Sequence, residues 1–339
     1  MHEAMFYKRI DGEESAVQCF LCNHHCRIND GHRGLCRVRE NQGGTLYSLV
    51  YGRLVTENVD PIEKKPLFHF LPASYSYSIS TVGCNFHCRH CQNYDISQYP
   101  SRYNNEIIGN HRTPQEVVES AGQQGCASIS YTYVEPTIFM EFALDTARLA
   151  AEQGIRNVFV SNGYTTPEAT RAIAPFLDAN NIDLKAFTDK FYREVCGAQL
   201  QPVLDTITLM KELGVWVEVT TLIIPGWNDS DAELKEIANF IKSLDSDIPW
   251  HVTRFQPTYK MTDRPATPTS SIKRAREIGL AAGLKHVYTG NLLDPEGEST
   301  YCPTCGKRLI TRTGFSSEVV NLEAGVCRNC HTALAGIYK

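Results

Sequence analysis

Three cysteines lie close together in the stretch STVGCNFHCRHCQNYD, residues 80–95: Cys84, Cys88 and Cys91. Cysteine thiolates are ligands both for zinc and for iron-sulfur clusters. A structural zinc site needs four ligands, so His87 or His90 would have to complete it. Three thiolates on a four-iron cluster instead leave one iron open to another ligand. The spacing therefore allows two kinds of site, a zinc knuckle or a cluster with a free iron.

The segments around this loop alternate short β-rich runs with helical patterns, which is typical of repeated βα units and a parallel sheet. Threonine or serine followed three residues later by glutamate predicts capping boxes at Thr113 and Ser230. About six βα units favour an α/β fold, a partial (βα)6 TIM-like barrel, over a closed eightfold one. The predicted strands cover residues 74–82, 127–134, 157–162, 181–187, 215–224 and 250–256, with a short run at 287–291.

The cysteine loop directly follows the first predicted strand, where catalytic groups gather in βα barrels. Its C-x3-C-x2-C spacing resembles the hallmark of the radical S-adenosylmethionine (SAM) superfamily. The resemblance implies that Cys84, Cys88 and Cys91 hold a [4Fe-4S] cluster whose open iron is chelated by the amino and carboxylate groups of SAM. It also implies that an electron passed through the cluster breaks a carbon-sulfur bond, leaving methionine and a 5'-deoxyadenosyl radical. The residue before the last cysteine lies against the adenine in this family, and here it is His90.

Polar residues at the ends of the next two strands are further candidates for cofactor binding. Glu135, in SYTYVEPT, could accept hydrogen bonds from the ammonium group of SAM. The family often has Gly-Gly-Glu at this point, so the glutamate is the residue that matches, with Thr132 beside it. Asn162, in SNGY, is placed to bind ribose hydroxyls, although Asn-Gly is also an ordinary turn.

Asp183 and Lys185 are two apart on a predicted strand and therefore face the same side. They form either a structural ion pair or part of the cofactor site, because DLK also resembles the fourth strand of the glycyl-radical activases. His251 matches a cofactor-side histidine of the same group, whereas a lone histidine is often structural. The resemblance to pyruvate formate-lyase activating enzymes covers about residues 75–290. The whole layout is similar to the AmmeMemoRadiSam system radical SAM enzymes.

Two more cysteine groups flank the predicted barrel. Near the end of the chain, two C-x2-C pairs predict a four-cysteine zinc ribbon. Near its start, four cysteines could bind zinc or an auxiliary iron-sulfur cluster, and spacing does not separate these alternatives. His24, His25 or His32 could replace one of the front cysteines. The predicted ligands are Cys302, Cys305, Cys327 and Cys330 in the tail, and Cys19, Cys22, Cys26 and Cys36 in front.

Composition limits the remaining choices. The chain has 339 residues, thirteen cysteines and a formal net charge of -5, which argues against a generally basic nucleic-acid-binding surface. No uninterrupted run of eighteen apolar residues occurs, and the first residues are too charged for a secretory signal. Grouped cysteines fit metal ligands in a reducing compartment. We expect a cytoplasmic protein that does not associate with membranes.

The predicted organisation is a cysteine-rich N-terminal module (1–70), a radical SAM partial barrel (71–292) and a zinc-ribbon-like module (293–339). The resemblance implies an oxidoreductase that cleaves SAM reductively, with flavodoxin or ferredoxin as electron donor. Its radical would abstract hydrogen from a small molecule, a protein or a modified macromolecule. One alternative is a glycyl-radical enzyme activase that acts on a partner protein. A second is a zinc-only scaffold or nucleic-acid-binding module, which the acidic balance disfavours.

Overall fold

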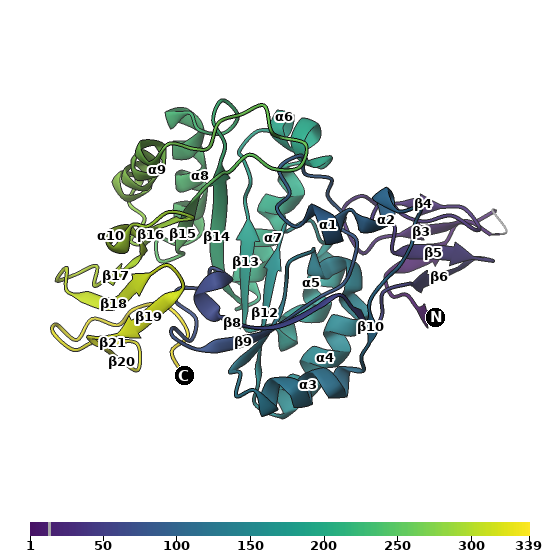
Figure 1. Ribbon diagram of the computed structural model, residues 1–339, viewed down its shortest axis with the longest axis horizontal. Helices are drawn as coiled ribbons and strands as arrows, with labels where there is room; N and C mark the ends of the chain where they lie inside the picture. Colours follow the sequence, from purple (N-terminus) through teal and green to yellow (C-terminus); the bar gives the residue numbers. More distant parts are fainter. Residues whose placement is uncertain (13–14) are drawn as a thin grey trace.

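The computed structural model describes residues 1–12 and 15–339. A parallel sheet with helices forms its centre, and two small β-rich modules lie at opposite ends of the long axis (Figure 1). The N-terminal module is at one end and the C-terminal module at the other. Among the described residues, no helix has the length and apolar character needed to cross a bilayer.

The central sheet has eight strands in the order β16-β15-β14-β13-β12-β11-β9-β8. Seven are parallel and follow one another in chain order, as expected for repeated βα units. They are β9 (Tyr75–Ser80), β11 (Ser128–Tyr131), β12 (Arg156–Ser161), β13 (Ala179–Asp183), β14 (Trp216–Ile223), β15 (Trp250–Arg254) and β16 (Val287–Gly290). The predicted α/β fold with a parallel sheet is confirmed. An antiparallel edge strand that was not predicted, β8 (Thr56–Pro61), pairs with β9.

The fourth predicted strand, 181–187, is too long, because β13 ends at Asp183. Beyond this point the backbone bonds to side chains instead of to a neighbouring strand. The N–H of Lys185 donates to the Tyr192 hydroxyl, and the Leu184 carbonyl accepts from the hydroxyl of Thr221. After Asp183 the chain therefore no longer hydrogen-bonds to the neighbouring strands of the sheet.

Helices connect the parallel strands and cover the outer face of the sheet (Figure 1). The predicted capping box at Thr113 and Glu116 is present. The box predicted at Ser230 is only half right: Ser230 caps the helix, but the Glu233 carboxylate accepts the N–H of Phe187 instead. The main helices are α3 (Pro114–Gln123), α4 (Met140–Glu152), α5 (Pro167–Ile173), α7 (Gln201–Glu212), α8 (Asp231–Leu244) and α9 (Thr269–Ala282).

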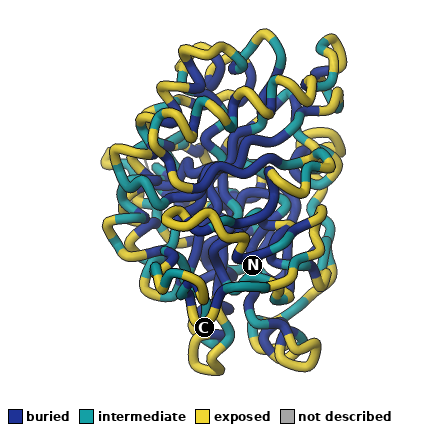
Figure 2. The backbone as a smooth tube through the Cα atoms, turned by 90° about the vertical axis from the view of Figure 1, so that its left-hand side faces the viewer, coloured by how far each residue is buried: buried dark blue, intermediate teal, exposed yellow. Residues whose placement is uncertain are grey.

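Both faces of the sheet are buried (Figure 2). Side chains alternate between the faces, so apolar residues such as Ile129 and Phe159 face the helices. The inner face carries small polar side chains such as Ser78 and Ser130. Part of it is filled by an apolar cluster in which Ile62, Leu67 and Phe70 pack on Val158 and Ala179. The rest of the inner face remains open as a pocket.

The two end modules consist of short antiparallel strands. The N-terminal strands form the sheets β2-β3-β4 and β1-β6-β5. The C-terminal strands form β17-β18-β19 and β20-β21. Their bounds are β1 (His2–Glu3), β2 (Tyr7–Arg9), β3 (Val17–Cys19), β4 (Arg27–Ile28), β5 (Arg39–Gln42), β6 (Thr45–Ser48), β17 (Thr300–Tyr301), β18 (Arg308–Thr313), β19 (Ser316–Val319), β20 (Leu322–Glu323) and β21 (Val326–Cys327). The division at residues 70 and 292 stays a prediction.

Candidate active site

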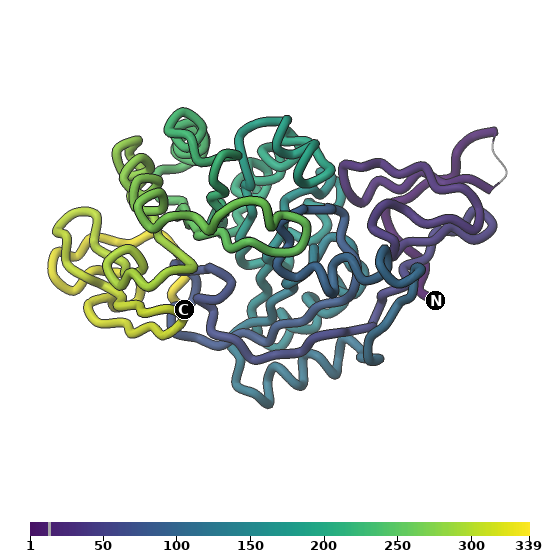
Figure 3. Tube along the Cα trace, turned by 45° about the horizontal axis from the view of Figure 1, so that its top comes forward, coloured from purple at the N-terminus to yellow at the C-terminus, as the bar shows by residue number. Residues whose placement is uncertain are grey.

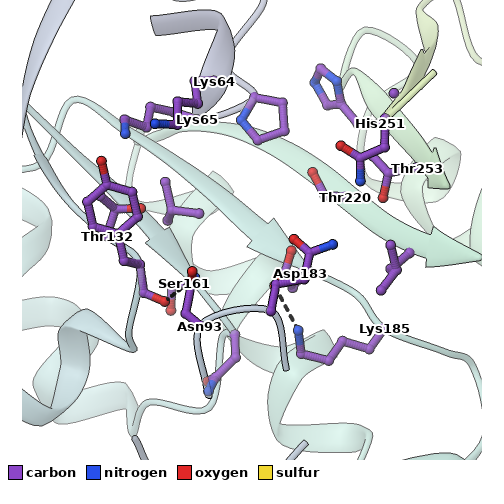
Figure 4. Close-up of a pocket in the computed structure, with 18 of the residues that line it drawn as sticks. Lys64, Lys65, Asn93, Thr132, Ser161, Asp183, Lys185, Thr220, His251 and Thr253 are labelled. Atoms are coloured by element: carbon purple, nitrogen blue, oxygen red, sulfur yellow. Dashed lines mark hydrogen bonds and ion pairs between the residues drawn. The ribbon is translucent and has the colours of Figure 1, made fainter. Parts of the chain in front are cut away.

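A pocket of about 660 Å³ opens at the carboxyl ends of the parallel strands. This is the edge at which βα folds bind their ligands. All nine residues predicted around the cofactor line this pocket: Cys84, Cys88, His90, Cys91, Glu135, Asn162, Asp183, Lys185 and His251. Figure 4 shows Asp183 at the end of β13, Lys185 just beyond it and His251 on β15 around the opening, with Thr132 and Ser161 nearby.

The three-cysteine loop begins at a position that only glycine can occupy. Gly83 has φ +96°, and a Cβ there would lie 2.5 Å from Cγ1 of Val38 and 2.9 Å from the Cys36 carbonyl oxygen. The loop then folds back on itself: the Phe86 N–H lies 3.4 Å from Sγ of Cys84. The N-terminal module is therefore packed directly against the start of the loop.

The three thiols are spaced too widely for one zinc ion. A tetrahedral zinc site with Zn–S bonds of about 2.3 Å places its sulfurs about 3.8 Å apart. Within the described residues, the one group of three or more cysteine, histidine or carboxylate ligands that lies within 4.8 Å is in the C-terminal module. Neither His87 nor His90 therefore completes a compact zinc knuckle. Three thiols around a larger space, with Cys88 buried and the other two partly exposed, fit a polynuclear cluster.

A fourth thiol touches this loop. The carbonyl of Cys196 accepts the His87 N–H at 2.9 Å, and its fully buried thiol lowers the pKa of Cys88. Burial instead raises the pKa of Cys84 well above its usual value, and the Glu135 carboxylate raises it further. No role was predicted for Cys196, because it lies outside the three-cysteine motif and far from it in the sequence. Nothing in its local sequence indicates the contact.

Glu135 and Asn162 meet beside Cys84. Oε1 of Glu135 accepts from the N–H and hydroxyl of Thr137 and from the hydroxyl of Ser161. Oε2 accepts the Asn162 N–H at 2.6 Å, and this is its one bond among the described residues. Because Oε2 accepts a single hydrogen bond, it can accept a second donor from the pocket. Burial raises the pKa of Glu135.

Asp183 and Lys185 form an ion pair of 2.7 Å on the opposite wall. Burial alone would lower the pKa of Lys185, but the charge of Asp183 and the nearby Cys88 and Cys196 thiols raise it well above its usual value. His90 is buried beside them, and burial lowers its pKa to about 3, so the ring is neutral. A neutral, flat ring suits contact with an aromatic base.

His251 pairs with Glu218, a residue that was not predicted as part of the site. Its Nε2 lies 2.7 Å from Oε2 of Glu218, and both side chains are almost fully buried. Glu218 also accepts the N–H groups of Phe68 and His69. The signal available in the sequence was a glutamate within a strand of mainly apolar and β-branched residues, two residues before Thr220.

Residues on the far rim of the pocket were not among the residues predicted from the sequence. Lys65 is 1% exposed and pairs with Asp60 at 2.7 Å, and burial lowers its pKa to about 8. Lys64 and Lys65 lie across the pocket from the Asp183–Lys185 pair (Figure 4). The C-terminal module contributes Phe315 to the same lining. Its side chains therefore help to form the part of the pocket that faces away from the cysteines.

The tail cysteines form a compact site. The four Sγ atoms lie within 4.8 Å of one another, with Cys302 and Cys330 at 3.5 Å and Cys305 and Cys327 at 3.8 Å. These distances fit tetrahedral zinc, and His331 is outside the group. The four front cysteines line a separate small cavity and are spaced more widely.

Comparison with known proteins agrees with this geometry. The model of the radical SAM superfamily matches residues 78–241. An uncharacterised protein of Methanocaldococcus jannaschii is 46% identical over 97% of this chain and 98% of its own length. A putative glycyl-radical enzyme activating enzyme of the same organism is 24% identical over 63% of this chain and 80% of its own.

Pyruvate formate-lyase-activating enzyme of Clostridium pasteurianum is 24% identical, over 48% of this chain and 67% of its own length. Among solved structures, Streptococcus suis SuiB bound to the precursor peptide SuiA superposes with a TM-score of 0.51. The sequences are 13% identical, and the match covers 68% of this chain and 51% of that chain. The structural similarity concerns the fold.

Proposed function

The chain belongs to the radical SAM superfamily and is an enzyme of that class, and on this basis we propose that it cleaves SAM reductively at Cys84, Cys88 and Cys91. The observation that carries the proposal is the convergence of three widely spaced thiols with Glu135 and Asn162 in one pocket. The bound cluster and SAM would supply the 5'-deoxyadenosyl radical, which abstracts hydrogen from the substrate.

The pocket residues have distinct proposed roles. The free acceptor position on Oε2 of Glu135 would receive the ammonium group of SAM, and Asn162 would bind the ribose. His90 would lie against the adenine. Asp183 and Lys185 would fix the cofactor on the other side, with His251 oriented by Glu218. The side of the pocket near Lys65 and Phe315 is then left for the substrate.

The cluster needs a low-potential electron donor, and we propose flavodoxin or ferredoxin in the cytoplasm. The C-terminal cysteines would bind a structural zinc ion, as their 3.5 and 3.8 Å spacing supports. A zinc-only scaffold is not supported, because the chain is an enzyme of the radical SAM class. The substrate is a protein, a modified macromolecule or a small molecule.

A second candidate is a glycyl-radical enzyme activase. It is favoured by two relatives at 24% identity, a putative glycyl-radical enzyme activating enzyme and a pyruvate formate-lyase-activating enzyme. In this case the substrate is a glycine of a partner protein. The distinguishing observation is a partner that acquires an oxygen-sensitive glycyl radical when the two proteins are incubated with SAM and reductant.

The test is production of 5'-deoxyadenosine and methionine by the anaerobically purified, dithionite-reduced protein. We expect the wild type to produce both, and Cys84→Ala to produce neither. Cys126→Ala is the matched control, because Cys126 is also buried but does not line the pocket. Cleavage by Cys84→Ala at the control's rate would contradict the proposal.

A further inference from the structure

Four cysteines of the N-terminal module surround one enclosed space. Cys19 ends β3, Cys26 precedes β4, and the Cys19 N–H donates to the Cys26 carbonyl at 2.9 Å. Cys22 and Cys36 complete the ring. The rest of the lining is mainly apolar: Leu21, Ile28, Leu35 and Ile138. Four thiols that converge on an otherwise apolar cavity indicate a metal site.

The spacing of these thiols distinguishes between the two metals that the sequence left open. A single zinc ion needs sulfurs about 3.8 Å apart, as the C-terminal cysteines have. No three of the front cysteines, with or without a histidine, lie within 4.8 Å of one another among the described residues. A four-iron cluster also takes four thiolates but holds them around a larger core. The front site is therefore too wide for zinc and suited to a cluster.

A buried arginine gives independent evidence for an anionic occupant. Arg39 is 2% exposed and lines the same cavity. One of its amino groups donates to Glu141 and to the Met5 carbonyl. Its Nε and Nη1 groups have no partner within the described part of the chain. Buried guanidinium donors are rarely left unpaired, and a cluster with four thiolates offers the negative charge and the sulfur acceptors that they lack.

We infer that Cys19, Cys22, Cys26 and Cys36 bind a second [4Fe-4S] cluster, to which the unpartnered Nε and Nη1 groups of Arg39 donate hydrogen bonds. The inference does not depend on cleavage of SAM. The site is in contact with the three-cysteine loop, because the Cys36 carbonyl abuts Gly83 and Nε2 of His24 lies 2.7 Å from the Asn85 carbonyl oxygen. Figure 3 shows the N-terminal module against the centre of the molecule on this side.

The test removes the first site and asks whether iron remains. The full-length variant Cys84→Ala/Cys88→Ala/Cys91→Ala is purified anaerobically and reconstituted with ferrous iron and sulfide. We expect about four irons and about four sulfides per chain, with an electron paramagnetic resonance signal after reduction that SAM does not change. One zinc per chain should remain in the tail. Absence of iron together with about two zinc ions per chain would overturn the inference.

A second variant covers the case in which the triple variant misfolds. Cys22→Ser/Cys26→Ser, in the otherwise unchanged chain, should lower the iron content from about eight to about four per chain. Its remaining signal should still shift when SAM is added. The matched control, Cys126→Ser, should keep the full iron content. An iron content of Cys22→Ser/Cys26→Ser equal to that of the wild type would refute the second cluster.

Discussion

Replacement of Glu135 by glutamine tests the cofactor site most directly. The substitution keeps the size of the side chain but removes its charge. The carbonyl oxygen of the new amide can still serve the three donors that now bond to Oε1. The amide nitrogen would then face the Asn162 N–H, which now donates to Oε2 at 2.6 Å. Two donors would oppose each other, and the ammonium group of SAM would lose its carboxylate.

The expected loss follows from these contacts. A hydrogen bond to a charged group contributes about 1.5–3 kcal/mol, which corresponds to a Kd for SAM weaker by about 10- to 150-fold. The displaced Asn162 N–H places the result toward the upper end. The assay is anaerobic calorimetric titration of cluster-loaded protein with SAM. Glu57→Gln is the control, since Glu57 lies outside the pocket lining, and it should bind SAM like the wild type.

The same contact predicts a dependence on pH. Burial raises the pKa of Glu135 above its usual value, and the charged form is the one that binds an ammonium group. Affinity for SAM should therefore fall as pH decreases through this raised pKa, and Glu135→Gln should lose that dependence. A Kd for Glu135→Gln within about threefold of the wild type, in a folded and cluster-loaded protein, would refute the role of the carboxylate.

Three further predictions concern the surroundings of the site. Gly83→Ala should destabilise the chain by about 2–5 kcal/mol, because the alanine would add both left-handed backbone strain and overpacking. Gly125→Ala, with φ +64° and open space around it, should cost about 1 kcal/mol. Thermal unfolding compares the two variants, and equal losses of stability would contradict the close contact at Gly83. Cys196→Ala removes the thiol that lowers the Cys88 pKa and should lower the reduction potential of the proposed cluster, measured by redox titration; an unchanged potential would contradict this effect of Cys196. Asp60→Asn leaves Lys65 as an unpaired buried charge and should cost about 3–5 kcal/mol near neutral pH, and a loss of stability below about 1 kcal/mol would contradict the pairing.

The sequence by itself determined the family of the chain, through the cysteine loop, and the parallel strands that carry this loop. Both are local patterns: three cysteines at short spacing, and apolar runs separated by helix caps such as Thr113. Strand order followed as well, because consecutive βα units pack side by side with one handedness. The sequence also predicted three residues that line the pocket, because each lies at or beside the carboxyl end of a strand: Glu135, Asn162 and Asp183.

Tertiary structure alone decided which distant groups touch these residues. Cys196 lies beside Cys88, and Glu218 pairs with His251. Local sequence does not show which partner either residue meets, because each contact joins separate elements. In the sequence, the tail and the front of the chain each show a similar group of four cysteines. The metals that we propose for them differ because of the sulfur spacing and the unpaired donors of Arg39, which depend on how the backbone folds around each space. The sequence specifies that the ligands are cysteine thiols, whereas the packing of the backbone around them sets the distances between their sulfur atoms.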